Sequence, residues 1–232
     1  MNRILPKPPA AAPSIEIRTL AERVHDLVRD RILSGSITAG EPIRQDSLAA
    51  EFGISKIPLR EALVRLEQNG LVSSQVHRGY IAARLSLAEA EEVYALRLEL
   101  EPAAVVRASR HVDAAARRAA EAALLAVNES VHDGSPDQGR LNRLFHLVLA
   151  QPGAGPLTMN FLEQLHMLSE RYTRLHLLQV GRDSRACAEH ERMLALWLAG
   201  ETEELAALTR HHVQDTLIDL RAQLAETDAA TP

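Results

Sequence analysis

Apolar residues recur at helical spacing near the start of the chain. One stripe within 19–34 predicts a helix, because its members fall on a single helical face. Thr19 and Glu22 fit a capping box at the beginning of that helix. The stripe consists of Leu20, Val24, Leu27, Val28 and Ile32.

A pair of shorter helices and two strand-like runs follow. The pattern predicts a helix over 47–52, a turn at Gly53, and a helix that is capped by Ser55 and ends at Gly70. The runs "LVSSQ" and "YIAAR" alternate like short strands around the tip "VHRG". This order of elements is that of a winged helix-turn-helix.

The remainder of the chain shows helical spacing throughout and no strand pattern. Pro102 is expected to kink or split the first of these helices. We therefore predict a mainly helical fold with a flexible tail at 1–18, a winged helix-turn-helix at 19–85 and an all-helical bundle at 86–228. The helices of the bundle are predicted at about 87–108, 113–131, 137–150, 156–178, 184–199 and 202–226.

Composition narrows the class of protein. Aromatic residues make up 3% and hydrophobic residues 46% of the chain, which favours cores of Leu, Ala and Val in helices. The single cysteine, Cys187, excludes an internal disulfide and fits a reducing compartment. No run of 18 apolar residues exists to span a membrane, so we expect a cytoplasmic protein.

Charge is distributed unevenly between the two parts. Residues 1–85 hold 12 Lys and Arg against 9 Asp and Glu, whereas 86–232 hold 14 against 22. The net charge of −5 is thus the balance of a basic first part and an acidic second part. This asymmetry predicts that only the first part contacts a polyanion.

The helix after Gly53 carries the side chains that suit DNA. A helix fits the major groove, where Arg60 can fork onto a guanine and Lys56 can meet guanine or phosphate. A helical interaction module with solvated charges is the alternative. The predicted DNA-binding residues are Arg44, Ser55, Lys56, Ile57, Arg60, Arg65, His77, Arg78 and Gly79.

Three histidines in the second part lie on three different predicted helices. His146, His190 and His212 could converge on one divalent ion, with Asn142 four residues before His146 as an oxygen ligand. Separate surface or core histidines are the alternative, because no CxxC or HExxH spacing is present.

The first part resembles the DNA-binding head of GntR-type bacterial transcription regulators. The resemblance rests on "LAAEFGISKIPLREALVRLEQNGLV" followed by "HRGYIA", within residues 19–83. The family usually has Arg at the position of Lys56 and often Thr at that of Ile57. The resemblance implies DNA binding but leaves the operator sequence open.

The second part is similar to the FCD ligand domain of the FadR subfamily, in its shorter VanR-like form with six helices. The similarity rests on "VYALRLELEPAAVVRA", "LNRLFHLVLA", "EHERMLALWLAG" and "RHHV". It implies that Asn142, His146, His190 and His212 hold a divalent metal ion, with Zn, Ni and Mn all suitable. Asn142 stands where the family often has Asp, so we expect weaker metal binding.

The resemblance also implies an effector and an assembly. Small carboxylates and sugar acids are the usual effectors, and Arg97, Arg171 and Tyr172 are the predicted contacts. A surface salt bridge between Arg97 and Glu101 is the alternative for Arg97. We expect a homodimeric, metabolite-responsive repressor on a two-fold operator, and no enzyme. The alternatives are a bundle that only dimerises and, remotely, a metal hydrolase with three histidine ligands.

Overall fold

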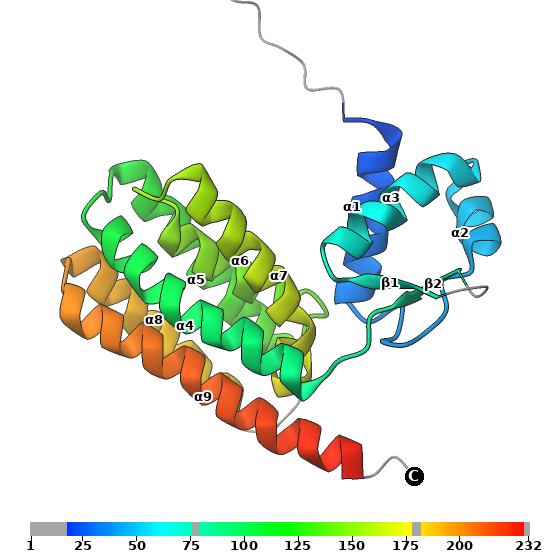
Figure 1. Cartoon of the computed structure of the whole chain (residues 1–232). Helices are drawn as coiled ribbons and strands as arrows, with labels where there is room; N and C mark the ends of the chain where they lie inside the picture. Colours follow the sequence, from blue (N-terminus) through cyan, green and yellow to red (C-terminus); the bar gives the residue numbers. More distant parts are fainter. Residues whose placement is uncertain (1–17, 76–78, 178–181, 230–232) are drawn as a thin grey trace, which may run out of the picture.

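The computed structural model describes residues 18–75, 79–177 and 182–229 of the chain. Within these residues, three helices and a two-stranded hairpin form a small N-terminal unit, and six more helices form a bundle (Figure 1). The predicted mainly helical fold, with a winged helix-turn-helix before an all-helical bundle, is confirmed.

The N-terminal unit, called the head below, is built as its apolar pattern predicts. It consists of α1 (Leu20–Leu33), α2 (Gln45–Phe52), α3 (Lys56–Gln68), β1 (Val72–Gln75) and β2 (Gly79–Ala82). The capping box at the start of α1 is present, with the amide of Glu22 donating to the Thr19 hydroxyl at 3.2 Å. The apolar face of α3 fills the head core, because Leu59, Leu63 and Leu66 are fully buried.

The turn between α2 and α3 depends on a glycine. Gly53 caps α2 at a φ of 65°, in the left-handed region that residues with a Cβ avoid. The strands pair antiparallel, with Val72 opposite Ala82 and Ser74 opposite Tyr80. The amide of Ile43 donates to the carbonyl of Tyr80 at 2.8 Å, so the segment before α2 is tied to the hairpin.

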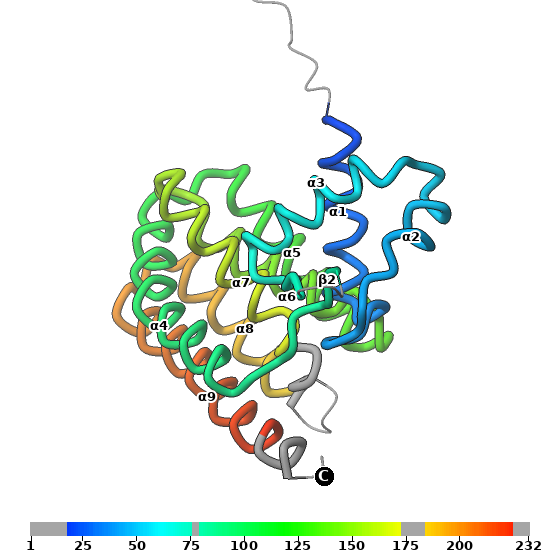
Figure 2. Tube along the Cα trace, turned by 45° about the vertical axis from the view of Figure 1, so that its right-hand side comes forward, coloured from blue at the N-terminus to red at the C-terminus, as the bar shows by residue number. Residues whose placement is uncertain are grey.

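Six antiparallel helices make up the bundle, and α4 and α9 lie side by side along it (Figure 2). Pro102 does not split α4, which is continuous through that residue. Ser86 caps α4 by accepting from the amide of Glu89 at 3.1 Å. The bundle comprises α4 (Leu87–Ser109), α5 (Ala114–His132), α6 (Gln138–Ala150), α7 (Pro156–Leu177), α8 (Arg182–Ala199) and α9 (Thr202–Ala229).

The bundle core is made mainly of Ala, Leu and Val, as composition predicts. Trp197 is its largest member and is fully buried. Its indole Nε1 donates to the carbonyl of Leu149 at 3.0 Å, which satisfies the polar atom of an otherwise apolar side chain. Trp197 is therefore a core residue that joins α8 to the end of α6.

Candidate functional site

The N-terminal half of α3 projects its side chains into solvent. Ser55, Lys56, Ile57 and Arg60 are all exposed, and the exposed fraction of Ile57 is 69%. An apolar side chain so exposed at this position suits contact with a thymine methyl group in the major groove. Arg44, at the N-terminus of α2, is exposed as well.

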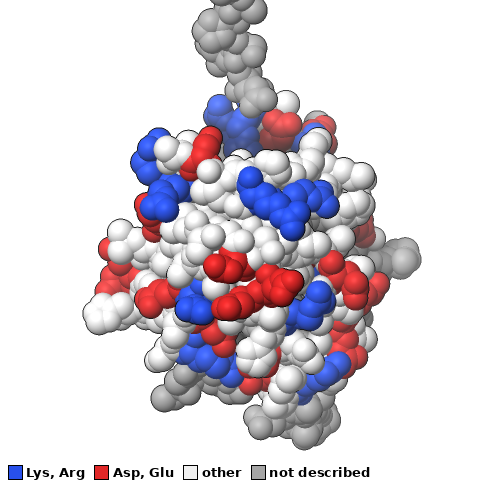
Figure 3. Space-filling model, turned by 90° about the vertical axis from the view of Figure 1, so that its left-hand side faces the viewer, with Lys and Arg blue, Asp and Glu red and all other residues white. Residues whose placement is uncertain are grey.

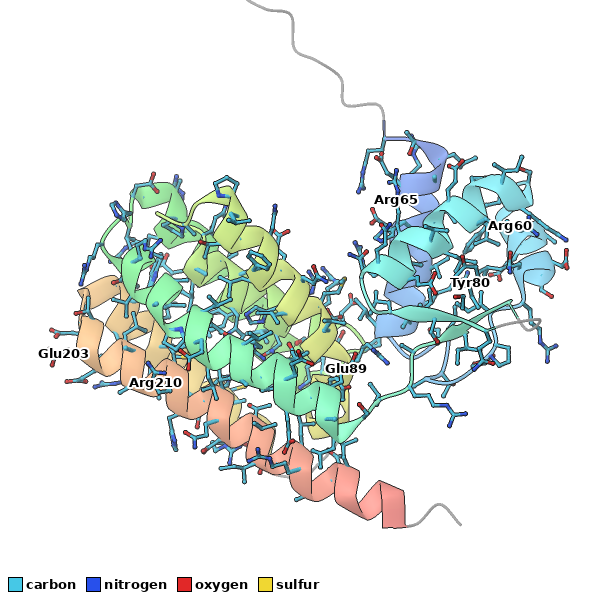
Figure 4. All side chains as sticks on the ribbon, viewed as in Figure 1. Arg60, Arg65, Tyr80, Glu89, Glu203 and Arg210 are labelled. Atoms are coloured by element: carbon cyan, nitrogen blue, oxygen red, sulfur yellow. The ribbon has the colours of Figure 1, made fainter. Side chains whose placement is uncertain are left out.

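Two exposed charges of α3 contact the first residues of α2. The Arg60 Nε donates to the Gln45 side chain at 3.4 Å, and Lys56 forms an ion pair with Asp46. Arg65 instead faces α1, where its guanidinium lies 3.6 Å from Glu22 (Figure 4). Arg65 thus lies on the side of α3 that is turned toward α1.

The predicted wing tip is described only in part. His77 and Arg78 lie outside the described residues, and Gly79 begins β2 at a φ of 75°. A Cβ on Gly79 would lie 3.3 Å from Nε2 of Gln45, so the wing approaches the start of α2 closely. Contact of any of these residues with DNA stays a prediction.

The three predicted histidines meet inside the bundle. His146 comes from α6, His190 from α8 and His212 from α9, and their exposed fractions are 0%, 2% and 7%. Their ring centroids are 5.1 Å, 5.1 Å and 4.8 Å apart. One nitrogen from each ring lies within 4.8 Å of the others. The arrangement contradicts separate surface histidines.

Glu101 on α4 is a central residue of the site that the sequence interpretation missed. It is fully buried, and its Oε1 lies 2.8 Å from Nδ1 of His146 while its Oε2 lies 3.3 Å from Nε2 of His166. His166, from α7, was missed as well. The available signal was a carboxylate on the buried face of a helix that also carries Tyr94, Val105 and Ala108.

Arg97 completes this network from one turn earlier on α4. Its guanidinium contacts Glu101 Oε2 at 2.9 Å and donates to the Ser169 hydroxyl at 3.3 Å. The predicted surface salt bridge with Glu101 is wrong in its location, because both side chains are buried. Arg97 has no free face toward solvent, and its contact with an effector stays a prediction.

A second carboxylate orients His212. Glu189 Oε2 lies 2.6 Å from Nδ1 of His212, so the carboxylate occupies Nδ1 and leaves Nε2 as the nitrogen that a metal ion could bind. Glu101 Oε1 lies 2.8 Å from Nδ1 of His146, but the two atoms are not aligned as a hydrogen bond. Glu189 precedes His190 on α8 and reaches across to His212 on α9.

Burial keeps the imidazoles of His146 and His190 neutral. Loss of solvent lowers the pKa of His146 to about 3 and lowers the pKa of His190 well below its ordinary value. Although burial acts to raise it, the charge of Arg97 above all holds the pKa of Glu101 well below its ordinary value. At neutral pH His146 and His190 therefore offer neutral nitrogen ligands beside the ionised carboxylate of Glu101.

The donor set fits a divalent transition metal. Among the described residues, both ring nitrogens of His190 and Nε2 of His146 are buried without a hydrogen-bond partner. Such atoms cost about 1–3 kcal/mol each unless an ion or water satisfies them. Imidazole nitrogens bind Zn at about 2.1 Å, so nitrogens that share one ion lie at most about 4.2 Å apart, against the 4.8 Å within which these three lie. Asn142 lies one turn before His146 on α6 and is half-buried.

The other two predicted effector residues face the segment between head and bundle. Arg171 donates to the carbonyl of Ala83, and the Tyr172 hydroxyl lies 3.2 Å from the carbonyl of Ser86. Tyr172 also contacts the carboxylate of Glu89. Both side chains are buried. A role of Arg171 or Tyr172 in effector binding stays a prediction.

Two family models match the chain over these two parts. The FCD domain matches residues 92–215, and the model described as bacterial regulatory proteins, gntR family, matches residues 20–81. The chain is a GntR-family transcriptional regulator with an FCD domain. The family consists of transcriptional regulators rather than enzymes. The alternative function of a metal hydrolase is therefore rejected.

Relatives of this GntR regulator match along most of its length. The BphR regulator of Paraburkholderia xenovorans is 29% identical over 90% of this chain and 88% of its own. The YdhC regulator of Bacillus subtilis is 28% identical over 73% of this chain and 76% of its own. The Escherichia coli McbR/YncC structure covers 89% of this chain and 99% of its own, with a TM-score of 0.80 at 20% identity. That structure supports the fold.

The face of the regulator that is turned away from the head carries charges of both signs. Figure 3 shows Asp and Glu interspersed with Lys and Arg across the bundle on this face. Mixed charges of this kind do not form the basic stripe that tracks a phosphate backbone. None of the described helices is long and apolar enough to cross a membrane.

Proposed function

We propose that this regulator is a cytoplasmic, metabolite-responsive repressor whose FCD domain holds a divalent metal ion. The ligands are His146, His190 and His212, with the Asn142 amide oxygen as the fourth protein ligand. The observation that carries the proposal is the meeting of three buried imidazoles from α6, α8 and α9. When bound, the ion supplies a positive charge that attracts an anionic effector.

The residues of the chain prepare this site in three ways. Glu189 fixes the ring of His212 with Nε2 free, and Glu101 Oε1 lies 2.8 Å from Nδ1 of His146. Burial keeps the rings of His146 and His190 unprotonated and ready to ligate at neutral pH. Helical packing holds the rings close together before binding, so little ordering entropy is lost.

A small carboxylate or sugar acid is the effector class that these charges favour. Arg97 and a divalent ion together outweigh the two negative charges of Glu101 and Glu189. Because Arg97 already contacts Glu101 and Ser169, clamping an effector requires it to exchange or share one of these contacts. The polar network is therefore positioned to respond when a carboxylate enters.

The head provides the DNA contacts, and two heads on a homodimer read a two-fold operator. Exposed apolar side chains on the bundle, among them Leu125 and Phe161 at 60% and 55% exposure, offer surface for self-association. Half-sites about 34–36 Å apart are expected for such a dimer. Effector binding changes operator affinity by reciprocal linkage.

Metal content is the decisive test. We expect about one ion per chain in protein purified without chelator, and none in the His146→Ala/His190→Ala variant, by elemental mass spectrometry. Both proteins should bind a DNA duplex selected from a random library by the wild type. A wild type that takes up no Zn, Ni or Mn on titration contradicts the metal site and favours a bundle that only dimerises.

A further inference from the structure

One stretch of α7, from His166 to Tyr172, contacts the buried site, the head and the interdomain linker. On its inner side His166 lies 3.3 Å from Glu101, and the Ser169 hydroxyl accepts from Arg97 at 3.3 Å. These two residues are three apart, so they share one face of the helix. This face of α7 therefore contacts the buried network of Glu101 and Arg97.

The outer side of the same stretch packs on the head. Met167 and Leu168 lie against the head core that includes Leu66 and Leu71. A Cβ on Gly70 would lie 3.3 Å from Cδ2 of Leu168, so the glycine permits this close approach. The head thus contacts the bundle through the helix that contacts the site; α7 is the bundle helix nearest the head in Figure 1.

The C-terminal end of this stretch contacts the linker, residues 83–86, which joins β2 to α4. The Tyr172 hydroxyl accepts from the amide of Ser86 at 3.2 Å and contacts the carboxylate of Glu89. Arg171 donates to the carbonyl of Ala83, and its guanidinium lies 3.7 Å from Glu89. Figure 4 shows Glu89 in the first turn of α4, at the end of the bundle next to the head.

The clamp formed by Arg171, Tyr172 and Glu89 is buried on its α7 side. The exposed fractions of Arg171 and Tyr172 are 6% and 0%, so a broken contact leaves their polar atoms buried, whereas the Glu89 side chain is 31% exposed. His166 and Tyr172 are six positions apart on α7, a distance of about 9 Å along a rigid helix. A displacement of His166 is therefore transmitted to Tyr172 and is not absorbed within the helix between these two residues.

We propose that the clamp of Arg171, Tyr172 and Glu89 on the linker transmits the state of the buried network to the position of the DNA-binding head. The inference rests on the proposed function, because it describes how that site regulates DNA affinity. Rearrangement of Glu101 and Arg97 displaces His166 and Ser169, and α7 carries this displacement to Tyr172 and the linker. Tyr172 is thus a positioning residue that contacts neither metal nor DNA.

The test compares Tyr172→Phe and Glu89→Gln with a matched control, Glu91→Gln. Glu91 pairs with Arg221 at 2.9 Å on the exposed side of α4, two residues from Glu89, and does not contact the linker. The operator duplex selected by the wild type is titrated with each protein, with and without Zn. Calorimetric titration with Zn alone gives the metal affinity of each variant.

We expect Zn to change the operator affinity of the wild type and of Glu91→Gln by at least about fivefold, the lower end of ordinary allosteric coupling. In Tyr172→Phe and Glu89→Gln this ratio should fall toward one, while the affinity for Zn stays within about twofold of the wild type. Retention of the full ratio in both variants overturns the inference, as does a wild type that binds Zn without any change in operator affinity.

A second measurement separates failure of the inference from failure of the metal site. His166→Gln perturbs the network without removing a proposed ligand, and its effect on operator affinity is measured alone and combined with Tyr172→Phe. Coupling through the clamp predicts that Tyr172→Phe abolishes the effect of His166→Gln in this double-mutant cycle. Additive effects overturn the inference even if no metal binds, and a non-additive result upholds it in that case too.

Discussion

The carboxylate of Glu189 on α8 lies 2.6 Å from Nδ1 of His212 on α9, and this pair fixes which nitrogen of the ring remains available. Against the effect of burial, the hydrogen bond from His212 and the charge of Arg185 lower the pKa of Glu189. The carboxylate is therefore ionised at neutral pH. Because the carboxylate contacts Nδ1, Nε2 of His212 is the nitrogen left to bind a metal ion together with His146 and His190.

Glu189→Gln should weaken metal binding by about tenfold, because a neutral amide orients the ring but no longer raises its basicity. Calorimetric titration with Zn measures the change. Glu191→Gln is the matched control, since Glu191 is exposed on the same helix and accepts from Asn128 at 3.2 Å. Equal affinities in the two variants would contradict the role given to Glu189.

Asn142→Asp should strengthen metal binding. A carboxylate adds a negative charge where the amide brings only an oxygen, so we expect a gain of about tenfold, or 1.4 kcal/mol. Asn142→Ala should lose affinity relative to the wild type. If calorimetric titration gives the same Zn affinity for the wild type, Asn142→Asp and Asn142→Ala, residue 142 is not a ligand.

Arg60→Ala should remove specific operator binding and leave the dimer and the metal content intact. A bidentate contact between arginine and guanine contributes about 1–3 kcal/mol of discrimination, so the specific complex weakens at least about fivefold in a gel shift. Arg117→Ala removes the same charge from an exposed pair with Glu121 on α5 and serves as the control. Normal operator binding by the Arg60 variant would refute the assignment.

The free energy of unfolding of Glu170→Gln should increase relative to that of the wild type as pH rises from about 4.5 to 7. Burial raises the pKa of Glu170, and the charge of Arg143 at 2.7 Å offsets this only in part. A raised pKa means that the folded state prefers the protonated carboxyl. The protonated Glu170 carboxyl thus stabilises the folded wild type at low pH, and this contribution is lost as pH rises through the pKa of the folded state. Urea unfolding of both proteins at pH 5 and pH 7 measures the difference, and the opposite trend would contradict the assignment.

Several parts of this protein follow from local sequence rules. The capping box of Thr19 and Glu22, the left-handed turn at Gly53 and the apolar face of Leu59, Leu63 and Leu66 depend only on residues close in the chain. They predicted the helices of the head and the order of elements. Alternating short runs likewise predicted the hairpin, and the placement of breakers predicted six helices in the bundle.

The histidine site was only partly accessible from sequence. His146, His190 and His212 could be nominated because each lies on a different predicted helix, and the packing of α6, α8 and α9 brings them together. Whether Glu101 faces solvent or the site depends on the rotation of α4 against its neighbours, which helical spacing does not fix. The same holds for His166 on α7.

The sequence by itself determined the two-part architecture, the helical bundle and the candidate nitrogen donors, because these depend on periodicity and on residue type. Only the tertiary structure decided that Arg97 and Glu101 are a buried pair and that Glu189 serves His212 rather than solvent. Tertiary packing also placed Arg171 and Tyr172 on the linker, more than 80 residues away in sequence. The physical reason is that these contacts join different helices, and the free energy of packing between helices sets their partners.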